Sequence, residues 1–577
     1  MAGLVVSLSS CFDDNYDLSD IDTTTRISVT DLVVPVNIDE VTLSDIIVPD
    51  EGSKIQAVTI NGQDFYALSE KGSFSSKPIE IKKVTAPAPK INSTKSTLSR
   101  IDFFGAPGMM RAPLGAVTYH LEGISTSFDY NGTNIDKSIV DIYSAKVEPI
   151  LFKVEYKVTG LESLIDRMYF TDFSLYAPLG LTATPSIGDY DPASGIWNIG
   201  SADIVDGTIS ITIETIGVDF RQAGCYITPE HTFSYAGQFN VIGGDLTIVP
   251  KIINGIPAEL PDKIEVVSNY TCSDLVVNEF SGRINYQLSG MNINPVYLTN
   301  LPDFLGGNET NIDLANPQIY LQVNNPVAGD NLDCSTGLTL SAIRQGEPTV
   351  DFTPDVNTIT VRHDLGVAGP YNFALSPDQS KLSVPDAFSS PEFIQFSSLG
   401  QLLAGEGLPD RIGITLNDPQ IPEQDVFDFA LGRSLEGVKG QYELLAPLAL
   451  NAGSQIVYSD RVDGWSSDDL DAVVVEALTI SANITNNTPL SAYLTVYPLD
   501  KNGNRMSGVE IQSTQIPANT EGMPFEIRLT GEVRLLDGVE LEARVVADES
   551  TNPLSPSQTI KLDHIRARVS GYYEKEL

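Results

Sequence analysis

Residues 152–158 read Phe-Lys-Val-Glu-Tyr-Lys-Val, with an apolar side chain at every second position and a charged one between. The same period of two recurs at residues 209–213 (Ile-Ser-Ile-Thr-Ile) and at residues 478–484 (Leu-Thr-Ile-Ser-Ala-Asn-Ile). A β-strand points successive side chains to opposite faces of its sheet, so this pattern predicts strands with one buried and one solvated face. Because the pattern occurs in widely separated parts of the chain, we expect an all-β protein.

The length and the turn residues predict several β-sandwich domains. The chain has 577 residues with 45 Gly and 35 Pro, which is too long for one hydrophobic core and rich in turn signals between short strands. We expect tandem Ig-like β-sandwiches on a flexible N-terminal tether. The predicted borders are 1–11 (signal remnant), 12–30 (acidic tether), 31–112 (small β-rich N-terminal domain and linker, with an Asn61-Gly62 hairpin turn), 113–255 (Ig-like sandwich), 256–440 (sandwich) and 441–577 (C-terminal sandwich and candidate binding domain).

Helical signals are scarce. The best one begins at Ser390-Pro391-Glu392 and continues through Leu399, Leu402 and Leu403. A serine cap, a proline at the first helical position and an acid in the first turn are start signals. They predict one short helix across the end of a sheet.

The charge balance is strongly acidic. The chain has 76 Asp and Glu against 35 Lys and Arg, a net charge of −41. Binding a phosphate backbone requires clustered Lys and Arg, so this balance argues against a nucleic-acid partner. It suits an outward-facing protein with a solvated acidic surface, and it leaves room for bound calcium.

The N-terminus carries a targeting pattern. Residues 4–11 read Leu-Val-Val-Ser-Leu-Ser-Ser-Cys, and residues 12–17 add Phe-Asp-Asp-Asn-Tyr-Asp. The first stretch resembles the lipobox of bacterial lipoproteins, and the cluster Asp13, Asp14 and Asp17 resembles the export tag of Bacteroides-type surface lipoproteins. The resemblance implies a lipid on Cys11 and a protein anchored to the outer face of the outer membrane. The alternative is an ordinary first strand followed by an ordinary thiol.

A second resemblance lies within residues 151–217. Pro178-Leu179-Gly180-Leu181 is followed by residues 188–200, Gly-Asp-Tyr-Asp-Pro-Ala-Ser-Gly-Ile-Trp-Asn-Ile-Gly. This run resembles the DUF11-type Ig-like repeat of bacterial surface proteins, which implies a spacer or binding module. In physical terms, residues 191–195 predict a tight turn, Trp197 is expected in the sandwich core, and Gly200 is expected to end a strand.

Few residues predict catalytic chemistry. The four histidines show no metal-binding spacing, and Gly-x-Ser-x-Gly and phosphate-loop motifs are absent from the sequence. A glycosidase needs only two carboxylates, but aromatic platforms for sugar rings are also expected, and the chain has two Trp. We therefore expect a protein that is not an enzyme and has no cofactor, with calcium as the one candidate ion.

Two loops offer oxygen ligands at alternate positions, as a hard cation requires. Asp189 and Asp191 lie in one loop, and Asp500, Asn502 and Asn504 lie in the other. Plain Asx turns are the alternative for both.

The cysteines leave two alternatives. Without Cys11, the chain retains Cys225, Cys272 and Cys334. Export permits a disulfide between Cys272 and Cys334, whereas buried free thiols at these positions fit the sequence equally well.

Trp465 is the candidate ligand-binding residue of the C-terminal domain. It lies among polar residues that include Asp463 and Asp468, the composition of a sugar-stacking platform. A tryptophan folded onto its own domain is the alternative. The leading hypothesis is thus a surface lipoprotein that binds a glycan through loops. The others are an accessory subunit docked on an outer-membrane β-barrel protein, and a fimbrial subunit that is cleaved after Arg26 and donates a strand.

Overall fold

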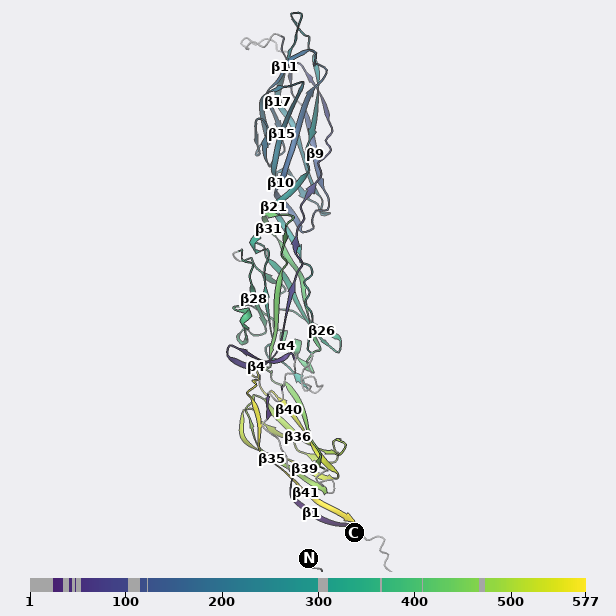
Figure 1. The fold of residues 1–577 in the computed structure, drawn as a ribbon, viewed down its shortest axis with the longest axis vertical. Helices are drawn as coiled ribbons and strands as arrows, with labels where there is room; N and C mark the ends of the chain where they lie inside the picture. Colours follow the sequence, from purple (N-terminus) through teal and green to yellow (C-terminus); the bar gives the residue numbers. More distant parts are fainter. Residues whose placement is uncertain are drawn as a thin grey trace, which may run out of the picture.

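The molecule is an elongated stack of three β modules, which we call distal, middle and base (Figure 1). This computed structural model describes residues 24–34, 41–43, 47, 53–101, 115–121, 123–298, 310–363, 366–406, 408–465 and 473–576. Both ends of the described chain lie in the base module, and the distal module forms the opposite pole (Figure 1). The prediction of an all-β fold is confirmed, because nearly every described element is a strand.

The base module is a sandwich of two sheets. Its strands are β1 (Thr24–Val34), β2 (Val41–Thr42), β34 (Gln455–Val462), β35 (Val473–Asn486), β36 (Ser491–Asp500), β37 (Glu510–Ile511), β38 (Thr514–Ile516), β39 (Thr520–Val533), β40 (Leu536–Val546) and β41 (Thr559–Glu576). One sheet has the order β1-β41-β35-β39-β37, with β2 paired to β41. The other contains β34-β40-β36-β38, and from β34 it continues into the middle module through β23 (Asn311–Ile312) and β30 (Gly405–Glu406). Apolar residues of both sheets, Ile527 and Val496 among them, form one core.

The middle module combines early and late parts of the chain. Its elements are β3 (Ile55–Ile60), β4 (Gln63–Ser75), β5 (Ile79–Glu80), β22 (Val296–Tyr297), β23 (Asn311–Ile312), β24 (Gln318–Val323), η2 (Ala328–Asp330), β25 (Cys334–Arg344), β26 (Glu347–Phe352), β27 (Ile359–Val361), β28 (Tyr371–Ser376), η4 (Gln379–Lys381), η5 (Asp386–Phe388), β29 (Glu392–Gln395), α4 (Leu399–Leu403), β30 (Gly405–Glu406), β31 (Arg411–Ala430), β32 (Ser434–Leu435) and β33 (Lys439–Pro447). One sheet of this module has the order β29-β28-β24-β33-β4-β3.

The distal module contains the segment that fixes the fold. Its elements are β6 (Thr85–Ala86), β7 (Thr94–Ser99), β8 (Val117–His120), β9 (Ser125–Gly132), β10 (Ile139–Val158), β11 (Ile165–Tyr176), β12 (Leu181–Pro185), β13 (Asp189–Asp191), β14 (Ile196–Ile204), β15 (Thr208–Asp219), α2 (Phe220–Ala223), β16 (Tyr226–Ile227), β17 (Phe233–Pro250), β18 (Ile252–Ile253), β19 (Ile256–Pro257), β20 (Lys263–Thr271) and β21 (Leu275–Gln287). Along β10 the alternating residues 152–158 bury Phe152, Val154, Tyr156 and Val158, as their period predicts.

Long strands join the distal and middle modules. A 12-stranded sheet has the order β12-β15-β10-β21-β31-β25-β26, so it begins in the distal module and ends in the middle one. β21 pairs with β10 on one side and with β31 on the other. Because backbone hydrogen bonds continue across this boundary, the two modules are built around a shared sheet.

The expected N-terminal domain differs from the observed arrangement. β1 pairs with β41 in the base, β4 pairs with β33 in the middle module, and β7 pairs with β20 in the distal module. The segment 31–112 therefore supplies strands to sheets completed by later residues, and residues 24–30 of the predicted tether belong to β1. A few short strands bury too little apolar surface to be stable alone, and they gain that burial at the edges of larger sheets.

Two local predictions have different outcomes. Asn61 and Gly62 have φ values of 54° and 76° and join β3 to β4, which confirms the hairpin turn. The helix predicted from Ser390 is partly wrong, because residues 392–395 form β29, a parallel neighbour of β28. Only residues 399–403 are helical, and they bury their three leucines. Among the described residues, no helix is long and apolar enough to cross a membrane.

Candidate functional site

A large hollow lies where the distal and middle modules meet. Its volume is about 810 Å³, within the range of ligand sites, and module boundaries are frequent places for them. We call it the junction cavity. Its lining residues are Glu80, Asp136, Lys137, Ser138, Val140, Ile227, Thr228, Pro229, His231, Asn285, Tyr286 and Gln287.

Backbone hydrogen bonds hold the walls of the junction cavity in place. The Asn285 amide donates to the Ser138 carbonyl over 2.8 Å, which ties the end of β21 to the loop before β10. Both oxygens of Asp136 accept backbone N–H groups, from Ser138 at 3.0 Å and from Lys82 at 3.1 Å. These contacts fix the Asp136 carboxylate as a structural acceptor of its own loop.

Two polar atoms of this cavity are buried without a hydrogen-bond partner in the described structure. They are Oδ1 of Asn285 and Nδ1 of His231. His231 also has a left-handed backbone, with φ at 54°, which is uncommon for a residue other than glycine. An unpaired buried polar atom costs about 1–3 kcal/mol. A ligand or water that pairs with these atoms would recover that free energy.

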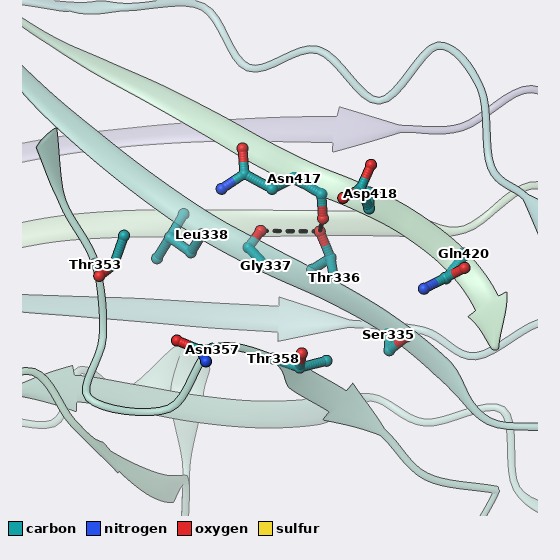
Figure 2. Close-up of a pocket in the computed structure, with 10 residues that line it drawn as sticks. All are labelled: Ser335, Thr336, Gly337, Leu338, Thr353, Asn357, Thr358, Asn417, Asp418 and Gln420. Atoms are coloured by element: carbon teal, nitrogen blue, oxygen red, sulfur yellow. Dashed lines mark hydrogen bonds between the residues drawn. The ribbon is translucent and has the colours of Figure 1, made fainter.

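A second, smaller pocket lies between β25 and β31 (Figure 2), with a volume of about 290 Å³. We call it the strand pocket. Opposite Thr336, residues Asp418 and Pro419 form a bulge in β31, and Asp418 has φ at 45°. A proline within a strand is accommodated at such a bulge. Most of the lining side chains carry a hydroxyl or an amide group; the lining residues are Ser335, Thr336, Gly337, Leu338, Thr353, Asn357, Thr358, Asn417, Asp418 and Gln420.

Internal hydrogen bonds fix part of the strand pocket. The Thr336 hydroxyl donates to the carbonyls of Gly337 and Asn417 at 3.0 and 3.2 Å (Figure 2). The Asn417 amide donates to the Thr339 hydroxyl at 2.6 Å. No hydrogen bond or ion pair to the exposed Asp418 carboxylate is found within the described parts of the chain, so it is available to a ligand.

One hydrogen bond joins the linings of the two pockets. Nε2 of Gln287, in the junction cavity, donates to Oε1 of Gln420, in the strand pocket, over 2.8 Å. These residues are register partners on β21 and β31. The shared sheet therefore places both hollows next to each other, and Gln420 lies at the end of the strand pocket with Ser335 (Figure 2).

The predicted sugar platform is wrong in its key residue. Trp465 is only 4% exposed and belongs to the base core, so its ring offers no face to a ligand. Asp463 is exposed, and Asp468 lies outside the described residues. The sequence around Trp465 is polar, but a large aromatic ring gains more free energy by burial than neighbouring polar residues can offset.

The calcium candidates close their own turns. Asp191 accepts from the Ala193 amide at 3.1 Å and the Ser194 hydroxyl at 2.5 Å, and these bonds, the Ser194 one above all, lower its pKa. Asp500 accepts from the backbone amides of Asn504 at 2.9 Å and Asn502 at 2.8 Å, and these bonds, the Asn504 one above all, lower its pKa. Asp189 is exposed in β13. Across the described ranges, no group of three or more His, Cys, Asp or Glu is placed to hold a metal ion.

The possible disulfide between Cys272 and Cys334 is not formed. Both residues and Cys225 are free thiols. Cys334 is buried in the middle module, with its Sγ 3.4 Å from Oδ1 of Asn325, whereas Cys272 follows β20 in the distal module. The two cysteines lie in different modules, which their spacing along the chain does not reveal.

The Trp197 segment of the distal module largely follows the expectation. Trp197 is fully buried and its Nε1 donates to the Ile187 carbonyl at 2.8 Å. The Gly195 amide donates to the Asp191 carbonyl at 2.8 Å and closes the predicted turn. Gly200 does not end the strand, because β14 continues to Ile204 and Gly200 lies at a register shift against Phe173.

The targeting residues Cys11, Asp13, Asp14 and Asp17 lie outside the described residues. Arg26, the expected cleavage position, lies in β1 and pairs with Glu574 at 3.0 Å. Its guanidinium also stacks on Tyr572, 4.5 Å from the ring centre. The structure thus places Arg26 within a paired strand.

Comparisons with known proteins do not assign a family. No family model matches the sequence, and no curated protein matches it. Among solved structures, a "putative secreted protein" from Parabacteroides distasonis is similar at 14% identity, covering 51% of this chain and 90% of that one, with a TM-score of 0.33. Broad bean stain virus is matched at 10% identity over 52% of this chain and 89% of that one, with a TM-score of 0.14. Both TM-scores are low, so neither name is carried over to this chain.

The lining residues of both pockets were missed at the level of sequence. Asn285, Tyr286 and Gln287 end an ordinary strand, and His231 stands in an ordinary turn. The one local signal is Asp418-Pro419 inside a strand pattern, since proline there indicates a bulge.

Proposed function

We propose that this protein binds a neutral oligosaccharide outside the cell without altering it chemically, and that the sugar chain extends across both pockets. The observation that carries this proposal is the Gln287–Gln420 hydrogen bond, which joins the two polar linings over 2.8 Å. Adjacent hollows of about 810 and 290 Å³ suit successive sugar units of one chain better than a single compact ligand.

The lining residues match the chemistry of a sugar. A sugar ring presents apolar C–H groups on its faces and hydroxyl groups at its rim. The C–H groups pack well on an aromatic ring. Tyr286 supplies that ring in the junction cavity. Oδ1 of Asn285 is a buried acceptor without a partner, suited to a sugar hydroxyl. In the strand pocket, Asn357 and Asp418 add an amide and a carboxylate.

Charge favours a neutral ligand over an acidic one. The net charge of −41 repels anionic polysaccharides at long range. Locally, the strand pocket contains the Asp418 carboxylate and no lysine or arginine. The carboxylates Glu80 and Asp136 outnumber Lys137 in the junction cavity.

The module order supports display away from a surface. β1 and β41, which contain the ends of the described chain, lie at the base pole (Figure 1). The residues that line the junction cavity come from the distal module and from β5 of the middle module. A lipid on Cys11, as the lipobox resemblance implies, would therefore hold the base near the outer membrane and leave the pockets far from it.

A glycan array followed by calorimetry tests the proposal. We expect neutral oligosaccharides to bind the full chain, and Tyr286→Ala to weaken binding by about 10–100-fold, because the stacking surface is lost. Tyr286→Phe keeps the ring and should bind within a few-fold of the wild type. Tyr176→Ala is the matched control, since Tyr176 is 43% exposed on the distal module and outside both pockets.

Two results would contradict this function. One is the absence of binding to any glycan by a folded chain. The other is equal affinity of the wild type and Tyr286→Ala for a glycan that does bind. Mass spectrometry of the recovered ligand should show no change in mass, whereas cleavage would make the protein an enzyme.

A further inference from the structure

The pole of the distal module ends in an apolar hairpin. β18 and β19 form a separate two-stranded sheet joined by Asn254 and Gly255, whose φ values of 49° and 83° are those of a tight hairpin turn. Three isoleucines of this hairpin are largely uncovered: Ile252 is 57% exposed, Ile253 is 49% exposed and Ile256 is 69% exposed. We call this feature the tip hairpin.

The tip hairpin lies at one end of the distal module. It follows the end of β17, where Pro250 is the register partner of Ile165. The turn between β14 and β15 lies at the same end of that sheet, and its Val205 is 70% exposed. This end is opposite to the junction with the middle module (Figure 1). Among the described residues, the far pole of the molecule therefore exposes four large aliphatic side chains.

The base pole carries an uncovered apolar strand. β1 is the first strand of its sheet, and within the described part of the chain it pairs only with β41 and its other edge is unpaired. Ile27 is 58% exposed, Leu32 is 41% exposed and Val33 is 63% exposed. Open edges with exposed apolar side chains are places where other chains attach, and proteins usually protect them with charge or proline.

We propose that copies of this protein associate end to end, with the tip hairpin of one copy packed on β1 of the next. Each copy has one apolar surface at each pole, and a contact between unlike poles covers both. Such a contact joins different surfaces and does not close on itself when the poles are opposite, so it builds a linear chain of molecules. The inference is independent of the glycan site.

The net charge of −41 favours this arrangement over lateral association. Side-by-side packing of two elongated molecules would bring their acidic surfaces together along the whole length. An end-to-end contact brings only the poles together, and charges further apart than about 8 Å are largely screened at physiological salt. A second copy is therefore a suitable occupant of both apolar surfaces.

Sedimentation velocity on the full chain, with Cys11→Ser to prevent thiol pairing, tests the proposal. We expect the Cys11→Ser chain without further substitutions to form a concentration-dependent series of oligomers. Ile252→Glu with Ile256→Glu should weaken association by about 100-fold or more, because a charged carboxylate would have to be buried without a partner. Ile27→Glu with Val33→Glu should do the same at the other pole.

A mixture of the two double variants is the decisive measurement. Each alone should be monomeric, but the intact tip of one and the intact base of the other should combine into a 1:1 dimer that cannot grow. Val350→Glu is the matched control, since Val350 is 75% exposed on the middle module and away from both poles. This control should associate like the wild type.

Three results would overturn the proposal. The first is a wild-type chain that stays monomeric up to about 1 mM, a weak-affinity limit. The second is a mixture of the double variants that remains monomeric, which would indicate contacts between like poles or none. The third is undiminished association of either double variant. All substituted side chains are exposed, so we expect every variant to fold. Circular dichroism of each variant checks that misfolding is not the cause of a lost association.

Discussion

The distal and base modules are both β-sandwiches, but they are stabilised differently. One hydrophobic cluster includes Trp197 in the distal module and extends to Leu403 in the middle module. The base has a cluster of its own around Trp465. The 12-stranded sheet also joins the upper two modules. The base meets the middle module through less: β34 pairs with β23 at one register position, Asn311 with Gln455, and the upper cluster also includes Leu490, Ala547 and Leu554 of the base. We therefore expect two stability units, the distal and middle modules together and the base module.

The chemistry of the two units differs as well. The distal core is rich in stacked and edge-on rings, for example Phe128 with Tyr235 at 5.5 Å and Phe170 with Phe173 at 4.6 Å. In the base, Arg505 bonds to Glu540 at 2.9 Å and to Glu542 at 2.9 Å. Buried aromatic rings contribute mainly by burial, whereas paired carboxylates contribute in a way that depends on pH. Perturbing each unit by itself tests whether they unfold separately.

Trp197→Ala is expected to have the largest effect. Trp197 is fully buried, and truncating such a ring costs about 3–5 kcal/mol. The loss should lower the stability of the distal and middle modules together and leave the base unchanged. Urea unfolding measures this well, because Trp465 is then the remaining tryptophan and its fluorescence reports the base, while circular dichroism reports all modules.

Val205→Ala serves as the control for that variant, because Val205 is 70% exposed in the same module and exposed positions usually change stability by less than about 0.5 kcal/mol. In Trp197→Ala, the urea midpoint reported by Trp465 fluorescence could shift together with the midpoint reported by circular dichroism. That result would show that the base unfolds together with the upper modules, as one unit.

The sequence predicts strands well where burial is one-sided. The period of two at residues 152–158 and the Asn61-Gly62 turn specify local structure through the backbone itself, and both are found. Trp197 is buried as predicted because its segment has the alternation of a strand. Trp465 has no such alternation around it, and its burial depends on strands that meet it only in the folded chain.

The candidate site depends on contacts between distant residues, and this is why the sequence does not show it. Gln287 and Gln420 become neighbours because β21 and β31 pair in one register. The same holds for β1, which sequence assigns in part to a tether and which the structure pairs with β41. The hydrophobic pattern of a strand limits its register, but it does not show which distant strand will be its neighbour.

Glu540→Gln should have a smaller effect, confined to the base. The Glu540 side chain is 6% exposed, and its hydrogen bond with Arg505 lowers its pKa. Removing one partner of such a pair costs about 1–3 kcal/mol here, because Arg505 remains partly solvated. We expect the Trp465 transition in urea to shift to lower urea at neutral pH, with the upper unit unchanged.

The same pair predicts an acid response of the base. A carboxyl whose pKa is lowered by folding stabilises the protein above its unfolded pKa, near 4.5, and this contribution is lost as pH falls through the folded pKa. The wild-type base should therefore lose stability below that pH, and Glu540→Gln should lose less over the same range. Equal losses in the two proteins would assign the acid response to other groups. Glu521→Gln is a suitable control, because Glu521 is exposed.

The last prediction concerns chemical labelling of the free thiols. Labelling reports the unfolding of one unit, and no change in stability is expected from it. Cys225 and Cys272 lie in the distal module and Cys334 lies in the middle one, while the described part of the base has no cysteine. Burial raises the pKa of both Cys225 and Cys334 to about 12. The thiolate is the reactive form, so both should resist a thiol reagent at pH 8 in the folded chain.

In a Cys11→Ser background, the reactivity of Cys225 and Cys334 should rise along the urea transition of the upper unit and not along that of the base reported by Trp465. Mass spectrometry after labelling assigns each thiol, and a Trp197→Phe variant leaves Trp465 as the fluorescent reporter in the same sample. If the base is the less stable unit, there is a urea range in which Trp465 has changed and both thiols are still protected. Labelling that follows the Trp465 signal instead would mean that base unfolding opens the upper core, and the continuous cluster around Trp197 would then depend on the base for its stability.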